Sequence, residues 1–589
     1  MRGSDAFRTG AALALLFVAG CVDEDPQQPD TGGLMPAPAV VAPPGASVAV
    51  QVQVPASMRT APFDATRTLT VPPDFTVAVY ARVPGARFLA VTPDGNLLVS
   101  HPAGGRVRLI RPNPGGDPLI SDFATGLRRP HDLVFHDLNG VTWLYVAETH
   151  QIDRYLYTAG DLTAQQRQVV VTGLPDASSP ELGGSYGHEL KNIALDANHK
   201  LYVSIASTCN ACTSDTQSNP VRASIYQYNA DGTGGRLFAR GLRNAEGLAL
   251  LNGSLWVAVN NRDNIAYPFH NDWTGDGTDD YGKVMQSYVD NHPPDEFTSV
   301  RDGGNYGWPF CNPNPDTPAG YDLMPFDRDV QFNASGSALD CNTADRIVQG
   351  IQAHSAPLGF SFLIGTAVPS AYQSGAALAY HGSWNRTQKT GYKVAHFPFD
   401  MTTQQPGDQL DLVTGWATSS SSWGRPVDVA VDGQGALLIS DDQAGAIYKL
   451  AYTPAPPPPP PPPANGIYEA EQGTLSGAVV ATQYSGFRGS GYVDFISDSG
   501  AYVELDVSVA TAGAYKLWFR YALRSGTIPL ELRVNGQVVA PNLAFKSSGR
   551  WTRWRGVTRV VTLNAGSNTV RLTTIGSNGP NLDLMTVEQ

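Results

Sequence analysis

A repeated pattern of paired apolar segments constrains the fold of this chain more than any other feature. Six stretches share one plan, a polar lead-in followed by an apolar strand, a turn and a second apolar strand: residues 87–100, 129–149, 188–204, 243–260, 355–384 and 425–440. Most begin about fifty residues apart, the length of a four-stranded propeller blade. The pattern therefore predicts an all-β fold, a six-bladed β-propeller. A β-sandwich is the alternative, although it would not repeat at this period.

A proline-rich run divides the chain into two domains. Residues 454–463 are almost entirely proline, which predicts a stiff polyproline spacer. We place the linker at 453–464, the propeller at 63–452 and a β-sandwich (jelly-roll) module at 465–589. A chain of 589 residues also exceeds what one hydrophobic core usually supports.

The N-terminus resembles a bacterial lipoprotein signal peptide. Arg2 and Arg8 precede a short apolar run that ends in V-A-G-C at Cys21. The run is too short to span a bilayer but fits a signal-peptide core. We expect residues 1–20 to be removed, Cys21 to carry a lipid and residues 21–62 to form a flexible tether. The protein would then lie in the cell envelope, held to the membrane by that lipid only.

The remaining cysteines predict disulfides rather than a metal site. Outside the cytoplasm an even number of cysteines favours pairing, and we expect Cys209–Cys212 and Cys311–Cys341. A zinc site is the alternative, but a single C-x-x-C without a second close pair indicates it weakly. Thr213 follows C-N-A-C where a c-type haem site would have histidine.

Basic and polar residues stand directly before the first strand of each repeat. In a propeller these strands line the central channel, so their lead-in residues meet at its mouth. They are Arg87, Arg129, His131, His188, Lys191, Arg243, Asn244, His354 and Arg425. Like charges repel when clustered, so we expect an anionic ligand there rather than a merely solvated rim. The net charge of −13 argues against nucleic acid.

Several motifs, in one order, carry a family resemblance. They include H-E-L-K-N (188–192), G-L-R-N-A-E-G-L (241–248), H-S-A-P-L-G-F (354–360), H-G-S-W-N-R (381–386) and G-R-P-V-D (424–428). Residues 75–452 resemble the pyrroloquinoline-quinone (PQQ)-dependent sugar dehydrogenases of the soluble glucose, sorbosone and pyranose dehydrogenase type. PQQ is a planar quinone with three carboxylates, which suits a basic channel mouth.

The resemblance implies roles for individual residues. His188 would be the base that takes the proton of the anomeric hydroxyl, with a packed structural histidine as the alternative. Arg243 would stabilise charge on the quinone beside Asn244. Arg87, His381 and Arg425 would hold the cofactor carboxylates. Lys191 stands where the family usually has arginine, so it keeps the charge but loses the bidentate fork. His131 and Arg386 are weaker candidates, and Trp384 is expected in the core unless it faces the channel.

Calcium is implied together with the quinone. In the family it is bound partly by backbone carbonyls of the segment that matches 260–263, which includes Asn261 and Arg262. A nearby loop offers further carboxylates, Asp272, Asp276, Asp279 and Asp280. Hard oxygen ligands suit calcium, although a solvated acidic loop explains this segment equally well.

The C-terminal module resembles carbohydrate-binding modules of families 6 and 35. The resemblance implies a structural calcium held by Glu469, Glu471 and Asp583, and sugar contacts from Tyr484, Trp551, Asn578 and Asn581. Each aromatic residue also has a core alternative. A tethered sugar binder would raise the local substrate concentration.

These features together predict a lipid-anchored dehydrogenase that oxidises an aldose or oligosaccharide, at the anomeric carbon or aldehyde, by hydride transfer to PQQ. Its partners would be a carbohydrate substrate, a glycan and a separate electron acceptor, and nothing in the sequence indicates an oligomer, so we expect a monomer. A calcium-dependent lactonase is one alternative, although that chemistry needs acidic residues at the axis. A propeller that only binds glycans is the other.

Overall fold

The computed structural model describes residues 47–363, 368–418, 421–453 and 466–589. The chain divides at residues 454 and 455 into two compact units, which are described separately below. The signal peptide, Cys21 and linker residues 454–464 lie outside the described residues. Val48–Gln51 (β1) pairs with Thr68–Val71 (β2), and Val52 is buried. Residues 48–62, expected in the tether, therefore pack on the N-terminal unit.

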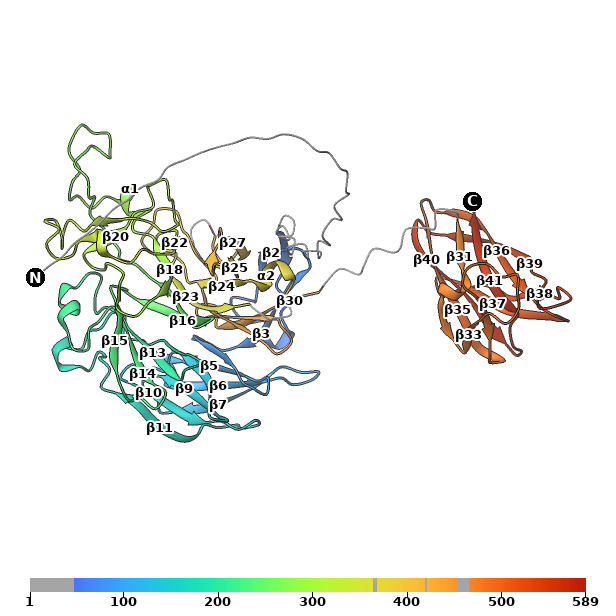
Figure 1. Ribbon diagram of the computed structural model, residues 1–589, viewed down its shortest axis with the longest axis horizontal. Coiled ribbons are helices and arrows are strands. Elements are labelled where there is room, and N and C mark those ends of the chain that lie inside the picture. Colours follow the sequence, from blue (N-terminus) through green and yellow to red (C-terminus); the bar gives the residue numbers. More distant parts are fainter. Residues whose placement is uncertain (1–46, 364–367, 419–420, 454–465) are drawn as a thin grey trace, which may run out of the picture. The chain divides into compact units, whose positions relative to one another are not determined.

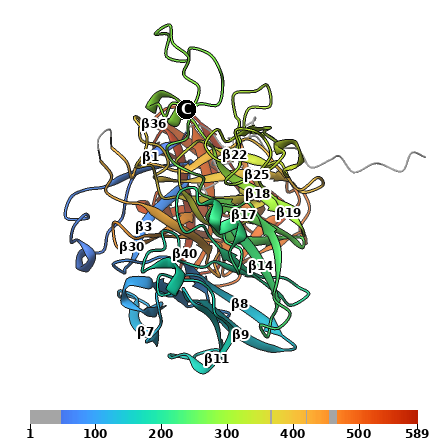
Figure 2. The same cartoon turned by 90° about the vertical axis from the view of Figure 1, so that its left-hand side faces the viewer.

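Six antiparallel sheets, in chain order, build the N-terminal unit (Figure 1). The first three sheets consist of the following strands: β4 (Leu89–Val91), β5 (Leu97–His101), β6 (Arg106–Arg111) and β7 (Leu119–Thr125); β8 (Leu133–Leu138), β9 (Val141–Ala147), β10 (Gln151–Leu156) and β11 (Gln165–Thr172); β12 (Ile193–Leu195), β13 (Lys200–Ile205), β14 (Ser224–Asn229) and β15 (Arg236–Arg240), with β19 (Gly304–Asn305) added in parallel. Figure 2 shows β8, β9 and β11 of the second sheet running together.

The other three sheets follow the same plan. Their strands are β16 (Ala245–Leu251), β17 (Ser254–Val259), β18 (Asp295–Val300) and β22 (Gln349–Ile351); β23 (Pro357–Phe362), β24 (Gly375–Tyr380), β25 (Lys393–Asp400), β26 (Gln405–Pro406) and β27 (Leu410–Val413); and β28 (Pro426–Val431), β29 (Leu437–Asp441), β30 (Ala446–Tyr452) and β3 (Phe75–Arg82). β3 completes the last sheet, so the beginning of the unit pairs with its end. Small elements are β20 (Cys311–Pro313), β21 (Phe326–Arg328), α1 (Gln286–Val289) and α2 (Ser370–Gln373).

The first strands of the six sheets form a closed ring. β4 contacts β8, and contacts continue through β12, β16, β23 and β28 back to β4. A separate apolar cluster fills the space between each pair of neighbouring sheets. Leu144 packs towards the first sheet, for example, and Tyr145 towards the third. The second strands of the sheets, such as β17 and β29, are buried along almost their whole length, whereas the outer strand β11 is mostly exposed.

Buried aspartates join neighbouring sheets at this ring. Asp428 accepts hydrogen bonds from the backbone N–H groups of Leu89 (2.9 Å) and Val429 (2.8 Å), which connects the last sheet to the first. Asp132 makes the same contact with Ile193 (2.9 Å). Both aspartates come from an R-P-x-D motif, at 129–132 and 425–428. The repeat thus encodes the connection between sheets as well as the strands.

We expect Asp428→Ala to lower the stability of the N-terminal unit. The substitution leaves two buried N–H groups without an acceptor, at a cost of about 1–3 kcal/mol each. Calorimetry of the full chain should show a lower unfolding temperature for this unit and an unchanged transition for the C-terminal unit. Exposed Asp64→Ala is the control; an equal effect of both substitutions would contradict the role of Asp428.

The C-terminal unit is a β-sandwich with its core between two sheets. One sheet contains β31 (Ile467–Glu469), β33 (Ala478–Ala481), β34 (Tyr492–Phe495), β36 (Gly513–Ala522), β39 (Arg555–Leu563) and β41 (Asn581–Glu588). The other contains β32 (Thr474–Ser476), β35 (Ser499–Val509), β37 (Thr527–Val534), β38 (Gln537–Lys546) and β40 (Gly566–Ile575). Inward residues of β36, Leu517 and Phe519, are fully buried, and they alternate with more exposed neighbours as a sandwich requires.

Candidate active site

Arg243 occupies the centre of a polar cluster at the lead-in to β16. It is almost fully buried, and its guanidinium donates through Nε to the Asn210 carbonyl oxygen (3.0 Å) and through Nη1 to the Asn261 carbonyl oxygen (2.8 Å). Nη2 lies 3.6 Å from the Asp263 carboxylate. Burial lowers the pKa of Arg243 to about 10 despite the charge of Asp263. The residue keeps its positive charge at neutral pH in a fixed orientation.

His188 lies beside this arginine with one ring nitrogen tethered. Nδ1 is 2.8 Å from the Ser207 carbonyl oxygen and 3.1 Å from its hydroxyl. Only an N–H can donate to a carbonyl, so the proton sits on Nδ1 and the Nε2 lone pair is available as a base. Nε2 has no hydrogen-bond partner among the described residues. Burial and the charge of Arg243 lower the pKa of His188 to about 4.

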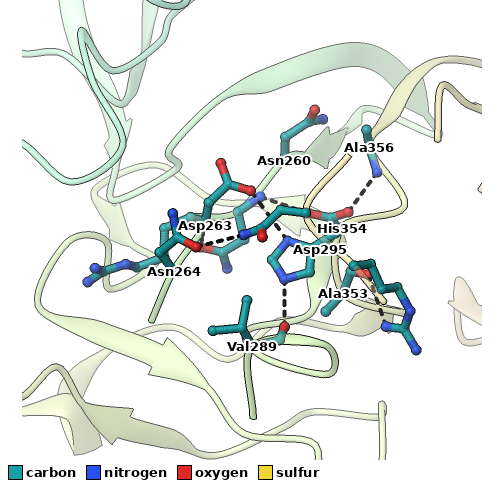
Figure 3. Close-up of polar contacts among 12 residues, drawn as sticks. Asn260, Asp263, Asn264, Val289, Asp295, Ala353, His354 and Ala356 are labelled. Carbon is teal, nitrogen blue, oxygen red and sulfur yellow. Dashed lines mark hydrogen bonds and ion pairs between the residues drawn. The ribbon is translucent and has the colours of Figure 1, made fainter. Parts of the chain in front are cut away.

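His354 also belongs to this polar cluster, because it contacts Asp263, the carboxylate that lies near Arg243. Figure 3 shows it between the Val289 carbonyl oxygen, 2.7 Å from Nε2, and the Asp263 carboxylate, 3.5 Å from Nδ1. Burial disfavours its charged form, but the hydrogen bond to Asp263 and the charge of Asp295 raise the pKa of His354. Asp263 therefore lies between the charged Arg243 guanidinium and the His354 ring.

A second cluster gathers three of the predicted cofactor residues around Asp442. Arg87 Nη1 and His381 Nε2 each donate to its carboxylate at 2.9 Å. Arg425 binds the carbonyl oxygens of His381 and Gly382, both at 2.8 Å. Burial alone would raise the pKa of Asp442, but the hydrogen bond from His381 and the charges of His381 and Arg87 hold it well below its usual range.

Buried polar residues connect the two clusters. Arg87 Nη2 donates to His131 Nε2 (3.3 Å), which is 3.7 Å from the Glu246 carboxylate. Glu246 accepts from the side chain of Asn244 (3.2 Å), the neighbour of Arg243. Among the described side chains, Arg87 Nε, His131 Nδ1 and Glu246 Oε2 are buried without a hydrogen-bond partner. Such atoms need a ligand or water to satisfy them.

Lys191 is placed differently from the other predicted cofactor residues. Its side chain is 0 % exposed, and Nζ donates to the Glu189 carbonyl oxygen and lies 4.9 Å from the centre of the Tyr186 ring. Burial lowers the pKa of Lys191 to about 7. Its neighbour Arg129 instead forms an ion pair with Glu189. Direct cofactor contact by Lys191 stays a prediction.

In the segment predicted to bind calcium, the carbonyl oxygens of Asn260 and Asn261 accept hydrogen bonds from Arg243, and the side chains bind other groups. Asn261 uses its amide to bind the Pro294 carbonyl oxygen (3.1 Å) and Glu296 (2.8 Å), and Arg262 is paired with Asp329.

In the acidic loop, the carboxylates accept hydrogen bonds from their own segment, as when Asp272 binds the N–H groups of Gly275 and Gly277. The described residues contain no group of three His, Cys, Asp or Glu side chains suited to a metal. The solvated-loop interpretation fits these contacts.

Two residues of the H-G-S-W-N-R motif stand at the edge of the site. Arg386 binds the Asp290 carbonyl oxygen and Asn291 (3.1 Å). Trp384 is 72 % exposed, so its assignment to the core is wrong. It follows a glycine with positive φ, Gly382, where the chain leaves β24 and turns outward.

The sequence analysis missed four residues that hold these side chains: Ser207, Asn210, Glu246 and Asp442. Asn210 lies inside the C-x-x-C motif and Ser207 two residues before it, and that motif drew attention only as a disulfide. Asp442 belongs to S-D-D (440–442) at the end of the last repeat. The sequence signal that could have revealed these residues is their position near a strand end, close to a lead-in residue.

In the C-terminal unit, two of the four residues predicted to contact sugar, Tyr484 and Trp551, lie next to each other. Tyr484 and Trp551 stack with ring centres 5.8 Å apart and an interplanar angle of 18°. Asn581 is buried, and its Nδ2 has no partner among the described residues. Asn578 is exposed and donates its backbone N–H to Asp498 (3.0 Å). A half-exposed aromatic pair of this kind can stack on a sugar ring.

The predicted carboxylates of that unit also approach one another. Burial, followed by the charges of Glu471 and Asp583, raises the pKa of Glu469. Oε2 of Glu469 and Oε2 of Glu471 are buried without a hydrogen-bond partner in the described part of the chain. Asp583 is paired with Arg520 and accepts from the Arg488 N–H (2.9 Å). The two free carboxylate oxygens suit a hard cation, with Asp583 engaged elsewhere.

Both expected disulfides are present, Cys209–Cys212 and Cys311–Cys341. No helix among the described residues is long and apolar enough to cross a membrane.

Comparisons with known proteins identify both units. Residues 69–453 match the TrAA12-like family. The chain belongs to this family. The TrAA12-like domain has the fold of the holo pyranose dehydrogenase PQQ domain of Coprinopsis cinerea (21% identity, 65% of this chain and 96% of that chain, TM-score 0.51). It is equally similar to a calcium structure of a Trichoderma reesei family AA12 enzyme (22% identity, 65% and 97%, TM-score 0.52).

The C-terminal unit matches carbohydrate-binding module family 35 over residues 466–588. An exo-β-D-glucosaminidase of Amycolatopsis orientalis is 38% identical over 122 residues, which cover 20% of this chain and 12% of that enzyme. The chain thus spans about an eighth of that relative's length. The predicted resemblance to PQQ-dependent sugar dehydrogenases with a carbohydrate-binding module is confirmed.

Proposed function

We propose that the TrAA12-like domain is a PQQ-dependent dehydrogenase that oxidises an aldose or oligosaccharide at its anomeric carbon. The closed ring of first strands supports a six-bladed propeller, with the two clusters at the mouth of its channel. The observation that carries the proposal is His188, with Nδ1 tethered and Nε2 available, beside the fixed cation of Arg243.

The residues present fit the cofactor. Arg87 and His381 bind the Asp442 carboxylate, and Arg425 binds the carbonyl oxygens of His381 and Gly382. The three side chains supply cationic or N–H donors suited to further carboxylates. The unpartnered buried atoms Arg87 Nε and His131 Nδ1 are donors that a quinone carboxylate would satisfy. PQQ, when bound, supplies the acceptor for the hydride of the sugar carbon.

The side chains of this site have two tasks in the reaction. His188 Nε2 takes the proton of the sugar hydroxyl, a contribution of about 10²–10⁴ in rate for a general base. Arg243, aimed by Asn210 and Asn261, stabilises negative charge where it develops. Its preorganised guanidinium needs no rearrangement during the reaction.

Calcium would bind through carbonyl oxygens. The Asn260 and Asn261 carbonyls lie against the Arg243 guanidinium, at 3.4 and 2.8 Å from Nη1, so oxygen donors face the proposed cofactor position. Such hard ligands suit Ca²⁺. The calcium structure of the similar Trichoderma reesei AA12 enzyme supports calcium as the metal.

The rest of the chain would bring the enzyme to its substrate. The family-35 module is proposed to bind a glycan through the Tyr484–Trp551 pair. Cys21 is proposed to carry a lipid that anchors the protein in the cell envelope. Electrons would leave through a separate acceptor.

Reconstitution tests the proposal. The apo-protein is titrated with PQQ and Ca²⁺, and dye reduction is followed with a panel of aldoses and oligosaccharides. We expect saturable, PQQ-dependent turnover. Stoichiometric PQQ binding without turnover on any sugar would contradict the substrate class, and an absence of PQQ binding would contradict the cofactor and favour a glycan-binding propeller.

A further inference from the structure

A disulfide-closed loop lies directly behind the proposed base and arginine. Cys209 and Cys212 enclose only Asn210 and Ala211. We propose that this loop is the positioning device of the active site, with Asn210 as the positioning residue for Arg243 and Ser207 as that for His188. The inference rests on the proposed function of the site.

The loop orients His188 through Ser207. The Ser207 hydroxyl donates to the Cys209 carbonyl oxygen at 2.9 Å, which leaves its oxygen lone pairs directed at His188 Nδ1, 3.1 Å away. The Ser207 carbonyl oxygen accepts from the same Nδ1. The Gly187 N–H, next to the base, donates to the Thr208 carbonyl oxygen at 3.0 Å. Movement of Cys209 would therefore change both the tautomer and the direction of the ring.

Asn210 holds the arginine and its counter-ion at once. Its carbonyl oxygen accepts from Arg243 Nε (3.0 Å), and its Oδ1 accepts from Arg243 Nη2 (3.1 Å). The same Oδ1 accepts from the Asp263 N–H (2.7 Å), and Nδ2 donates to the Asp263 carbonyl oxygen (2.7 Å). The Trp308 indole also binds the Asn210 carbonyl oxygen (3.3 Å). One short segment thus fixes the distance between Arg243 and Asp263.

Backbone contacts lock the loop to the strand of the arginine. The Ser207 N–H donates to the Arg243 carbonyl oxygen at 2.8 Å. Beyond the loop, buried Asp215 accepts from the Thr208 N–H (2.7 Å) and hydroxyl (2.8 Å). Between these two anchors, the disulfide restricts the remaining freedom of Asn210.

The size of the ring indicates a local role. A disulfide stabilises the folded state more when it closes a longer loop. The separation is 3 residues for Cys209–Cys212 and 30 for Cys311–Cys341. The second bond is therefore expected to contribute more to global stability, and the first to the geometry of the residues it encloses.

Paired variants separate these roles. Cys209→Ser/Cys212→Ser and Asn210→Ala are compared with Cys311→Ser/Cys341→Ser as the matched loss of a disulfide. We expect the first two to lower the PQQ-dependent kcat about 10–100-fold while the sugar KM changes less than threefold. The control should lower the melting temperature more and keep kcat within threefold.

A second readout uses the apo-protein. In ¹⁵N-histidine spectra, with His188 assigned through His188→Gln, the wild type should show a single Nδ1–H tautomer. Cys209→Ser/Cys212→Ser should show a mixture, whereas the control and Asn210→Ala, which acts on Arg243, should match the wild type. An unchanged tautomer in Cys209→Ser/Cys212→Ser, or unchanged kcat in both site variants, would overturn the inference. Failure of the wild type to bind PQQ would instead overturn the proposed function, and the apo spectra would still decide the positioning role.

Discussion

His188→Ala is expected to reduce the PQQ-dependent kcat by about 10²–10⁴, the usual contribution of a general base. PQQ should still bind, because the residues proposed to hold its carboxylates, Arg87, His381 and Arg425, are positioned by Asp442 and by backbone carbonyl oxygens rather than by His188. Stopped-flow dye reduction and a separate PQQ titration measure the two effects. Retention of more than a tenth of kcat would contradict the role of His188 as base.

The pH profile of the wild type gives an independent check on the same residue. Burial and the charge of Arg243 lower the pKa of His188 to about 4, so the neutral base persists well below pH 6.5. The acid limb of kcat/KM should therefore lie below the ordinary histidine pKa. The control is His270→Ala, at an exposed residue beside the acidic loop. It should change neither kcat nor the pH at which the acid limb of kcat/KM falls.

The repeat period and the order of the motifs were enough to predict six sheets, because each unit of about fifty residues encodes two apolar strands in series. The R-P-x-D motifs even contain the contact between sheets, through Asp132 and Asp428. The strand β1 at the beginning of the unit was not predicted. It lies in an apolar segment that resembles a linker because the segment is rich in proline. Val52 is nonetheless buried against the last sheets.

The repeat predicts which residues gather near one another, but it does not predict the residues that hold them in place. Arg87 and His131, lead-in residues of the first two repeats, are in contact because their strands are neighbours in one ring, and the missed residue Glu246 connects them to Asn244. Asp442 is 355 positions from Arg87, and only the closure of the ring brings them together. Side-chain direction was the second limit. Lys191, three residues after His188, has a fully buried side chain that donates to the Glu189 carbonyl oxygen, which its spacing from His188 does not reveal.

Arg243→Ala is expected to lower kcat by about 10²–10³, the cost of removing one preorganised donor from a site of developing negative charge. It should also raise the pKa of His188, because the charge of Arg243 contributes to lowering it. The acid limb of kcat/KM should then move to higher pH. Exposed Arg236→Ala, which removes surface contacts with Asp302, Gln227 and Phe238, is the control and should leave both quantities unchanged.

Arg243→Lys distinguishes charge from geometry. Lysine keeps the positive charge that acts on His188, but its single ammonium cannot reproduce the three directions in which Arg243 donates, to both oxygens of Asn210 and to the Asn261 carbonyl. We therefore expect the acid limb to return to its wild-type position while kcat stays reduced. If lysine restored kcat as well, charge alone would suffice, and the fixed orientation imposed by the disulfide-closed loop would have no catalytic consequence.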